Sequence, residues 1–204
     1  MRKLSQLEKQ MILKLNCRTH PVLDRLMLCV TKMGNGGLVW IIISLVLIWN
    51  RRAAEGVLTL IALAITAFLI NLIIKPMFTR KRPYELIQSI RTKLNPPFGS
   101  SFPSGHAASS FAAASMLWLM NAPLWSFAVV LACLIAVSRV YLFVHFPSDV
   151  LVGAVLGVAI SYATYVLAGR IGGQVIEEWL EQHLAWHLNQ ISLTVRYLLQ
   201  RQVI

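Results

Sequence analysis

The sequence predicts an all-α, polytopic membrane helix bundle, and three observations lead to this fold class. Hydrophobic residues make up 57% of the 204 residues and only 13% are charged, whereas soluble domains carry roughly 25% charged residues. Several uncharged stretches reach the roughly 20 apolar residues that a helix needs to cross a bilayer. The length suits one domain, and the apolar stretches leave no room for another. We therefore expect a single membrane-embedded domain over residues 1–204.

The charge balance and the cysteines limit the partners. Nineteen Lys and Arg against eight Asp and Glu give a net charge of +11, which attracts anionic lipid head groups or binds phosphate. We expect no nucleic-acid partner, because the basic residues lie between or at the ends of apolar stretches. Cys17, Cys29 and Cys133 form no C-x-x-C pair, so neither a disulfide framework nor a thiolate metal site is expected.

Residues 1–32 predict an amphipathic N-terminal segment. Lysines interrupt any apolar core that a cleavable signal peptide would need, so this segment should remain in the mature protein. Its apolar residues share one helical face: Leu4, Leu7, Met11 and Leu15. This pattern favours a helix in the membrane interface, and a soluble helix packed on the domain fits nearly as well.

The spanning core is predicted over residues 33–169 and contains about five membrane-crossing helices. A long stretch without Lys, Arg, Asp or Glu is broken by the turn signature Asn121-Ala122-Pro123, which divides it into a helical hairpin. The predicted spans are residues 33–50, 56–74, 106–120, 124–142 and 150–169. The span over 106–120 is rich in Ala and Ser, which allow close helix approach in lipid, so we expect it at the centre of the bundle.

The tail over residues 173–204 is too polar to span a membrane. Apolar residues again fall on one helical face: Ile176, Leu180, Leu184, Ile191, Val195 and Leu198. We expect an interfacial helix, with a partner-binding helix as the less favoured alternative.

The direction of the spans gathers the unusual polar residues at one membrane face. If the second to fifth helices alternate in direction, this face holds the loop after the second, the start of the third, the end of the fourth and the start of the fifth. The residues concerned are Lys75, Arg80, Lys81, Arg82, Pro103, Ser104, Gly105, His106, Ser138, Arg139, His145 and Asp149. The opposite turn at residues 121–123 carries no charge.

Three cations in this group suit a phosphorylated substrate: Lys75, Arg82 and Arg139. A guanidinium binds phosphate oxygens in a bidentate fork, and an ammonium adds a point charge. Arg139 follows an apolar stretch, where an ionisable residue usually serves function. We interpret the remaining loop cations as interfacial anchors: Arg80, Lys81, Arg91 and Lys93.

Two histidines accompany the cations. Pro103-Ser104-Gly105-His106 predicts a helix start, with Ser104 as the cap and free amides that favour an anion. His106 lies beside this anion site, where it can protonate a leaving oxygen. Asp149 follows His145 by four residues, although Pro147 disfavours one continuous helix across them. A carboxylate that accepts the imidazole proton leaves the other nitrogen as a nucleophile.

The combination resembles the type 2 phosphatidate phosphatase family. Three ordered motifs match the family pattern without substitution and cover residues 75–149: Lys75 with Arg82-Pro83 after six intervening positions, Pro103-Ser104-Gly105-His106, and Ser138-Arg139 followed by His145 and Asp149. The resemblance implies a membrane lipid phosphatase that needs no metal and no cofactor. Asp24 and Asp149 are also the only aspartates, which makes a carboxylate metal site hard to assemble.

The resemblance assigns a role to each motif residue. It implies that Lys75, Arg82 and Arg139 bind phosphate and that Ser104 and the Gly105 amide complete the cradle. His145 would attack phosphorus and become phosphohistidine, with Asp149 orienting it. His106 would protonate the departing alcohol and then activate water.

The substrate stays open between phosphatidate, phosphatidylglycerophosphate and a polyprenyl diphosphate. The common bacterial layout of the family has six spanning helices, and here an amphipathic stretch up to about Lys32 replaces the first. That layout also resembles undecaprenyl-diphosphate phosphatases of the same superfamily. The alternative from another class is a non-catalytic protein that binds or transports lipid phosphates, which would not need both His106 and His145.

Two arguments about the orientation conflict. The resemblance implies an inner-membrane protein whose active site faces the periplasm or exterior. The distribution of Lys and Arg points the other way, with seven before the first span and six between Lys75 and Lys93, because cytoplasmic segments carry more of them. The opposite face holds only Arg51, Arg52, Arg170, Arg196 and Arg201. We expect the exterior-facing site.

Overall fold

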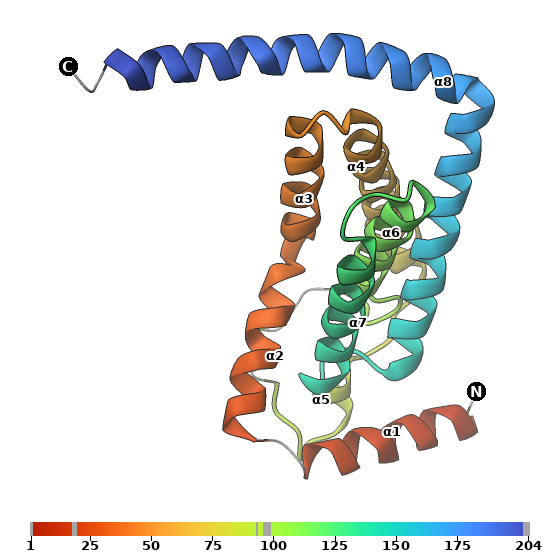
Figure 1. Cartoon of the computed structure of the whole chain (residues 1–204). Helices are drawn as coiled ribbons and strands as arrows, with labels where there is room; N and C mark the ends of the chain where they lie inside the picture. Colours follow the sequence, from red (N-terminus) through yellow and green to blue (C-terminus); the bar gives the residue numbers. More distant parts are fainter. Residues whose placement is uncertain (1, 18–19, 93, 96–98, 202–204) are drawn as a thin grey trace.

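The computed structural model describes residues 2–17, 20–92, 94–95 and 99–201, and within these ranges it is a helical bundle without strands (Figure 1). The all-α prediction is confirmed. The elements in chain order are α1 (Arg2–Asn16), α2 (Pro21–Met33), η1 (Asn35–Gly37), α3 (Leu38–Trp49), α4 (Ala53–Phe68), η2 (Leu69–Ile74), η3 (Lys75–Met77), α5 (Pro83–Leu86), α6 (Gly105–Leu119), α7 (Trp125–Tyr141) and α8 (Pro147–Arg201).

Two helices in the described ranges are long and apolar enough to cross a membrane. They are Ala53–Met77, formed by α4, η2 and η3, and Pro147–Arg170, the first part of α8. A third span results if α2 and the helix Asn35–Trp49, bent by 48°, count as one. Helix α7 is apolar but shorter. Large apolar side chains are exposed along these helices, among them Leu45, Val46, Leu151 and Val155, as lipid contact requires. The number of five spans stays a prediction.

Helix α6 lies at the centre of the bundle, as its small residues predict, and contacts α4, α7 and α8. Ala107, Ala108 and Ala112 are fully buried. The facing surface of α8 has glycines at the points of closest approach. A Cβ on Gly157 would overlap the backbone oxygen of Ala108, and a Cβ on Gly153 would lie 2.5 Å from that of Ser104. The two helix backbones therefore touch without side chains between them.

The N-terminal segment differs from the expectation in one respect. We expected an amphipathic stretch up to Lys32 and a first span from residue 33, whereas α2 contacts α7 and leads directly into α3 through a bend. Gly36 and Gly37 have positive φ angles of 59° and 72° at this bend, a conformation that glycine adopts without strain. Helix α2 is thus part of the bundle, because packing against α7 buries Met27, which an interfacial helix would expose to lipid.

Helix α1 lies across one end of the bundle (Figure 1). It buries Glu8 and Ile12, while Leu7 and Met11 remain exposed. Leu15, from the predicted apolar face, is half-buried, and the burial of Leu4 lies outside the described residues. One face therefore packs on the domain, and the other leaves apolar side chains free for the membrane interface.

The tail turns away from the bundle at Gly172, whose φ of 126° interrupts α8. Beyond it the helix runs across the end opposite α1 (Figure 1). Leu184 from the predicted apolar face is half-buried. The other side chains of that face lie outside the described part: Ile176, Leu180, Ile191, Val195 and Leu198.

The connections that carry the predicted site lie at the end of the bundle near α1 (Figure 1). There α4 ends and continues into η2 and η3, α7 ends, and α8 begins at Pro147. Pro147 is the first residue of α8, so His145 lies before the helix and Asp149 lies in its first turn. The alternating direction assumed for these helices is confirmed.

Candidate active site

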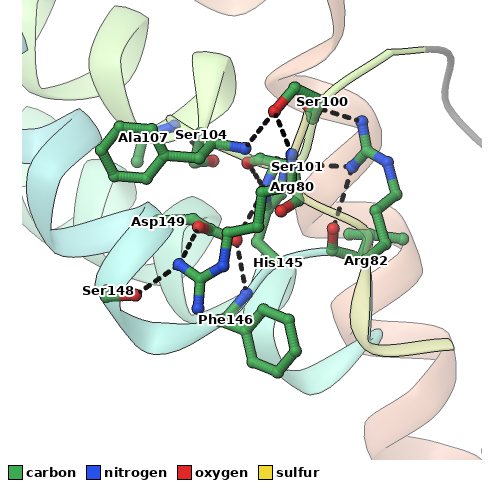
Figure 2. Close-up of polar contacts among 12 residues, drawn as sticks. Arg80, Arg82, Ser100, Ser101, Ser104, Ala107, His145, Phe146, Ser148 and Asp149 are labelled. Atoms are coloured by element: carbon green, nitrogen blue, oxygen red, sulfur yellow. Dashed lines mark hydrogen bonds and ion pairs between the residues drawn. The ribbon is translucent and has the colours of Figure 1, made fainter. Parts of the chain in front are cut away.

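Figure 2 shows a polar cluster in which residues from three connections meet. Arg80 and Arg82 come from the loop after η3, Ser101 and Ser104 from the segment before α6, and His145 and Asp149 from the α7–α8 connection. His145 and Asp149 are 2% and 0% exposed. These two side chains are therefore shielded from water although they lie at the end of the bundle.

His145 has a defined hydrogen-bonding state. Its Nδ1 lies 2.7 Å from the backbone oxygen of Ser101, and since a carbonyl can only accept, Nδ1 carries the proton. Its Nε2 lies 3.4 Å from Nη1 of Arg82. Burial, followed by the charges of Arg139 and Arg82, holds the pKa of His145 well below its usual range. The imidazole is therefore neutral, and Nε2 has a lone pair beside a guanidinium.

Asp149 lies near the same imidazole but makes its shortest contacts elsewhere. Its Oδ2 is 3.7 Å from Nδ1 of His145, which is beyond a hydrogen bond. The same oxygen accepts from the backbone N–H of Phe146 at 2.8 Å. The direct partner of the histidine is thus the Ser101 carbonyl, which sequence reasoning missed because a backbone acceptor leaves no residue-type signal. The orienting role of Asp149 stays a prediction.

Arg80 corrects an expectation, because its interpretation as an interfacial anchor is wrong. Its Nη1 donates to Oδ1 of Asp149 at 2.6 Å, and its Nη2 donates to Oε2 of Glu8 at 2.6 Å. In the sequence, a basic residue in a loop looks the same whether it faces lipid head groups or a buried carboxylate. Lys81 and Arg91 are exposed, as anchors would be, and Lys93 lies outside the described residues.

The three predicted phosphate-binding cations are held by different elements. Arg82 is 1% exposed, and its Nη1 donates to the Val144 carbonyl at 2.9 Å. Lys75 donates to Oδ1 of Asn71 at 3.2 Å. Arg139, 3% exposed, donates from Nη1 to the Thr31 hydroxyl at 2.5 Å. Its Nε is buried and has no hydrogen-bond partner within the described residues, so this donor is available to an anion.

The start of α6 has the predicted cap. Ser104 is its N-cap, and the hydroxyl accepts from the backbone N–H of Ala107 at 3.5 Å. The backbone N–H of Ser104 donates to the Asp149 carbonyl at 3.0 Å, which ties α6 to α8. A Cβ on Gly105 would lie 3.5 Å from Nζ of Lys75. The ammonium thus lies directly beside the first amides of α6, where helix N-termini bind anions.

His106 belongs to the same helix start and lies against the bend between α2 and α3. Its Nε2 is 2.9 Å from Oδ1 of Asn35, and a Cβ on Gly34 would lie 3.0 Å from its ring. Asn35 was not among the predicted site residues. The predicted span over residues 33–50 included the Gly-Asn-Gly-Gly sequence, and only the fold shows that a turn forms there and meets His106.

A cavity of about 520 Å³ begins at the site and extends along α3, α4 and α6. Lys75, Gly105 and His106 line its polar end. Its remaining wall is largely apolar and includes Ile41, Leu60, Leu63, Ala64, Ala67 and Ile70. A ligand with a charged head and an apolar chain fits this distribution.

Within the described residues, no group of three or more His, Cys, Asp and Glu side chains could hold a metal ion. The positive charge at the site comes from side chains and from the amides of α6. Phosphoryl transfer depends mainly on positioning and on stabilising the charge of the transferred group. A neutral imidazole beside buried cations can attack phosphorus, and a second histidine can move the proton of the leaving oxygen.

Comparison with known proteins finds phosphatases among the relatives of this chain. A family model described as the PAP2 superfamily matches residues 55–172. The chain is 36% identical over 136 residues to the decaprenylphosphoryl-5-phosphoribose phosphatase of Mycobacterium tuberculosis, which covers 66% of this chain and 72% of the relative. It is also 28% identical over 169 residues to the undecaprenyl-diphosphatase of Sulfolobus acidocaldarius. That alignment covers 82% of this chain and 81% of the relative.

A solved structure shares the fold. It is that of a transmembrane PAP2-type phosphatidylglycerolphosphate phosphatase from Bacillus subtilis, with a TM-score of 0.71 and 23% identity. The alignment covers 84% of this chain and 89% of that chain. The family match includes every predicted site residue, while Glu8, Thr31 and Asn35 lie before its start.

Proposed function

Since the chain belongs to the PAP2 superfamily and is a membrane lipid phosphatase, we propose that it removes the terminal phosphate of a lipid through a phosphohistidine on His145. Nε2 of His145 attacks phosphorus, the bond from phosphorus to the lipid oxygen breaks, and His106 gives that oxygen a proton. His106 then takes a proton from water, which attacks the phosphohistidine and releases inorganic phosphate. The cations neutralise the phosphate throughout.

The hydrogen bond between Nδ1 of His145 and the Ser101 carbonyl carries this proposal. It fixes the tautomer whose Nε2 is unprotonated, and burial keeps the ring neutral. A nucleophilic role needs both conditions. A non-catalytic protein that binds or transports lipid phosphates needs neither, and this alternative is not favoured.

His145→Ala should abolish turnover of a lipid phosphate, and the wild type should give an acid-labile, alkali-stable phosphoramidate on rapid quench. His20→Asn is the matched control, because His20 is an exposed helix cap. Near-normal turnover by His145→Ala would contradict the proposal. EDTA should leave the wild-type rate unchanged, and activity that is lost in EDTA and restored by magnesium would contradict the metal-free mechanism.

We propose further that the apolar chain of the substrate lies in the cavity beside α4. The relatives are named for decaprenylphosphoryl-5-phosphoribose and undecaprenyl diphosphate, and both have a long apolar chain. Ala64 lines the cavity, so Ala64→Phe should lower kcat/KM for a lipid phosphate and leave that for a water-soluble phosphate ester unchanged. Ala163→Phe, on an exposed position of α8, is the control. Equal loss for both substrates would refute this placement.

The physiological lipid is best identified by a panel of phosphatidate, phosphatidylglycerophosphate and undecaprenyl diphosphate. The enzyme should prefer one of these lipids over a soluble ester, because binding of the remote apolar tail of the lipid can be used to position the phosphate. Equal specificity constants for all substrates would show that the lipid tail contributes nothing to catalysis.

We propose an inner-membrane location with the site facing the exterior. Ser89 is exposed at the site's end of the bundle, and Ser126 is exposed at the start of α7, at the opposite end. In a version without native cysteines, Ser89→Cys should react with an impermeant maleimide in intact cells, and Ser126→Cys should react only after the membrane is opened. The reverse pattern would place catalysis in the cytoplasm.

A further inference from the structure

Glu8 is the only acidic residue of α1, and it is buried against the active-site end of the bundle. Its side chain is 4% exposed, whereas its neighbour Leu7 is 60% exposed. Burying a carboxylate is costly unless hydrogen-bond donors surround its oxygens. At this position of α1, a charged side chain is therefore buried while the neighbouring apolar side chain is exposed.

Both oxygens of Glu8 are bound by groups of the active-site region. Oε2 accepts from Nη2 of Arg80 at 2.6 Å. Oε1 accepts from the backbone N–H of Ser148 at 2.9 Å. This N–H belongs to the first turn of α8, where backbone donors have no partner within the helix. Glu8 therefore joins the loop after η3 to the start of α8.

Arg80 carries the contact on to Asp149. Its Nη1 donates to Oδ1 of Asp149 at 2.6 Å and to the hydroxyl of Ser148 at 2.7 Å. Figure 2 shows its guanidinium directed at these two residues, with Phe146 next to it. The guanidinium carbon lies 4.5 Å from the centroid of the Phe146 ring. One guanidinium is thus shared between two carboxylates, and its place depends on both.

The position of Asp149 in turn affects two parts of the site. Its backbone oxygen accepts from the N–H of Ser104 at the start of α6. Its Oδ2 lies 3.7 Å from Nδ1 of His145. A shift of Asp149 would therefore reach both the nucleophile and the helix start that receives the phosphate.

We propose that Glu8 is a positioning residue of the phosphatase site. From the amphipathic helix α1 it holds Arg80, and through Arg80 it holds Asp149 beside His145. The inference rests on the proposed catalytic roles of His145 and Asp149. In this arrangement α1 is a component of the catalytic site as well as a segment at the membrane surface.

Loss of the Glu8 charge leaves Arg80 with Asp149 as its carboxylate partner and leaves the Ser148 N–H without a charged acceptor. Arg80 then lacks one of the two carboxylates that fix its guanidinium, so the place of its other partner, Asp149, is less well defined. We expect Glu8→Gln to lower kcat between about tenfold and about a hundredfold, because misplacing a reacting group by roughly 1 Å has an effect of that size. KM should change less than about twofold, because uniform substrate binding is unaffected when the altered residue does not contact the substrate.

The experiment compares Glu8→Gln, Arg80→Gln and the double variant, using kcat and KM for a lipid phosphate in detergent micelles and the melting temperature of each protein. Lys9→Gln is the matched control, because Lys9 is exposed on the same helix. If Glu8 acts through Arg80, the double variant should lose no more than the more impaired single variant. A merely structural role would lower the melting temperature and leave the kcat of the folded enzyme unchanged.

Wild-type kcat in Glu8→Gln, or losses that multiply in the double variant, would overturn the proposal. If Glu8→Gln gives no folded enzyme, Glu8→Asp decides, because it keeps the charge on a shorter side chain. A lower kcat at unchanged melting temperature then supports the positioning role, and a wild-type kcat overturns it. His145→Ala is assayed in parallel. Turnover by that variant would refute the proposed function itself, whereas its inactivity with normal turnover by Glu8→Gln would refute only the role of Glu8.

Discussion

Gly153→Ala should impair catalysis far more than its single added methyl group suggests. The new Cβ would lie 2.5 Å from the Ser104 oxygen, a backbone atom that cannot rotate away. The helices would have to separate by roughly 0.9 Å to restore the shortest ordinary contact of 3.4 Å, because close-packed interiors have no free space to absorb it. Asp149 lies one turn earlier on α8, and its carbonyl binds the Ser104 N–H. Separation by about 1 Å should lower kcat by about a hundredfold.

The assay is steady-state hydrolysis of a lipid phosphate by purified variants, with melting temperatures to show that each is folded. Gly169→Ala is the matched control on the same helix, because nothing lies within 4 Å of the Cβ it would introduce. That control should keep full activity and become more stable by about 0.5 kcal/mol, since alanine restricts the unfolded chain and favours helix. Equal kcat in the two variants would refute the argument that contact between α6 and α8 positions the site.

Three further predictions concern single contacts. Burial lowers the pKa of His145 in the folded protein, so below pH 6.5, the ordinary pKa of histidine, the unfolded chain binds a proton at this residue more readily than the folded protein does. The melting temperature of the wild type should therefore fall more steeply than that of His145→Gln as the pH drops below about 6.5. Parallel curves for the two proteins would contradict the lowered pKa. Asn35→Ala should lower kcat for lipids with poor leaving groups more than for an activated aryl phosphate, because His106 loses its partner; an equal effect on both would show that Asn35 does not act through the proton donor. Ser110→Ala should cost about 1–3 kcal/mol of unfolding free energy by leaving the buried Trp40 indole N–H unpaired, measured by denaturant titration, and a cost near zero would contradict this.

The site residues that could be predicted from the sequence are those whose side-chain type and spacing form a pattern. Arg82, His106 and His145 stand in motifs whose spacing and chemistry are visible in one dimension. The Ser101 carbonyl was invisible, because any residue offers the same acceptor and only the backbone path brings it to the imidazole. Glu8 was missed because 141 positions separate it from Asp149, and only the folded chain joins them through Arg80.

The fold shows the same division. The apolar stretches and the turn at Asn121 predicted the helices after residue 50 closely. In lipid, each helix needs apolar side chains and must form all its backbone hydrogen bonds internally, so its own sequence determines where it lies. Whether α2 lies at the membrane surface or in the bundle depends instead on its contact with α7. Its residues suit a surface helix until Val30 and Met27 find apolar neighbours in the bundle. The position of α2 therefore depends on tertiary contacts and cannot be predicted from the local sequence pattern.

The straight part of α8 connects the chemistry to the thickness of the bilayer. Pro147–Arg170 comprises 24 residues, which rise about 36 Å as a helix, against roughly 30 Å of hydrocarbon. A helix longer than the hydrocarbon layer adjusts its tilt to hide its apolar surface. Asp149 is in the first turn of this helix and is bonded through its backbone to Ser104, so a change of tilt pulls at the site itself. Turnover should therefore vary with acyl-chain length in bilayers of otherwise identical lipids. Bilayer thickness would then regulate the rate of this phosphatase through hydrophobic mismatch.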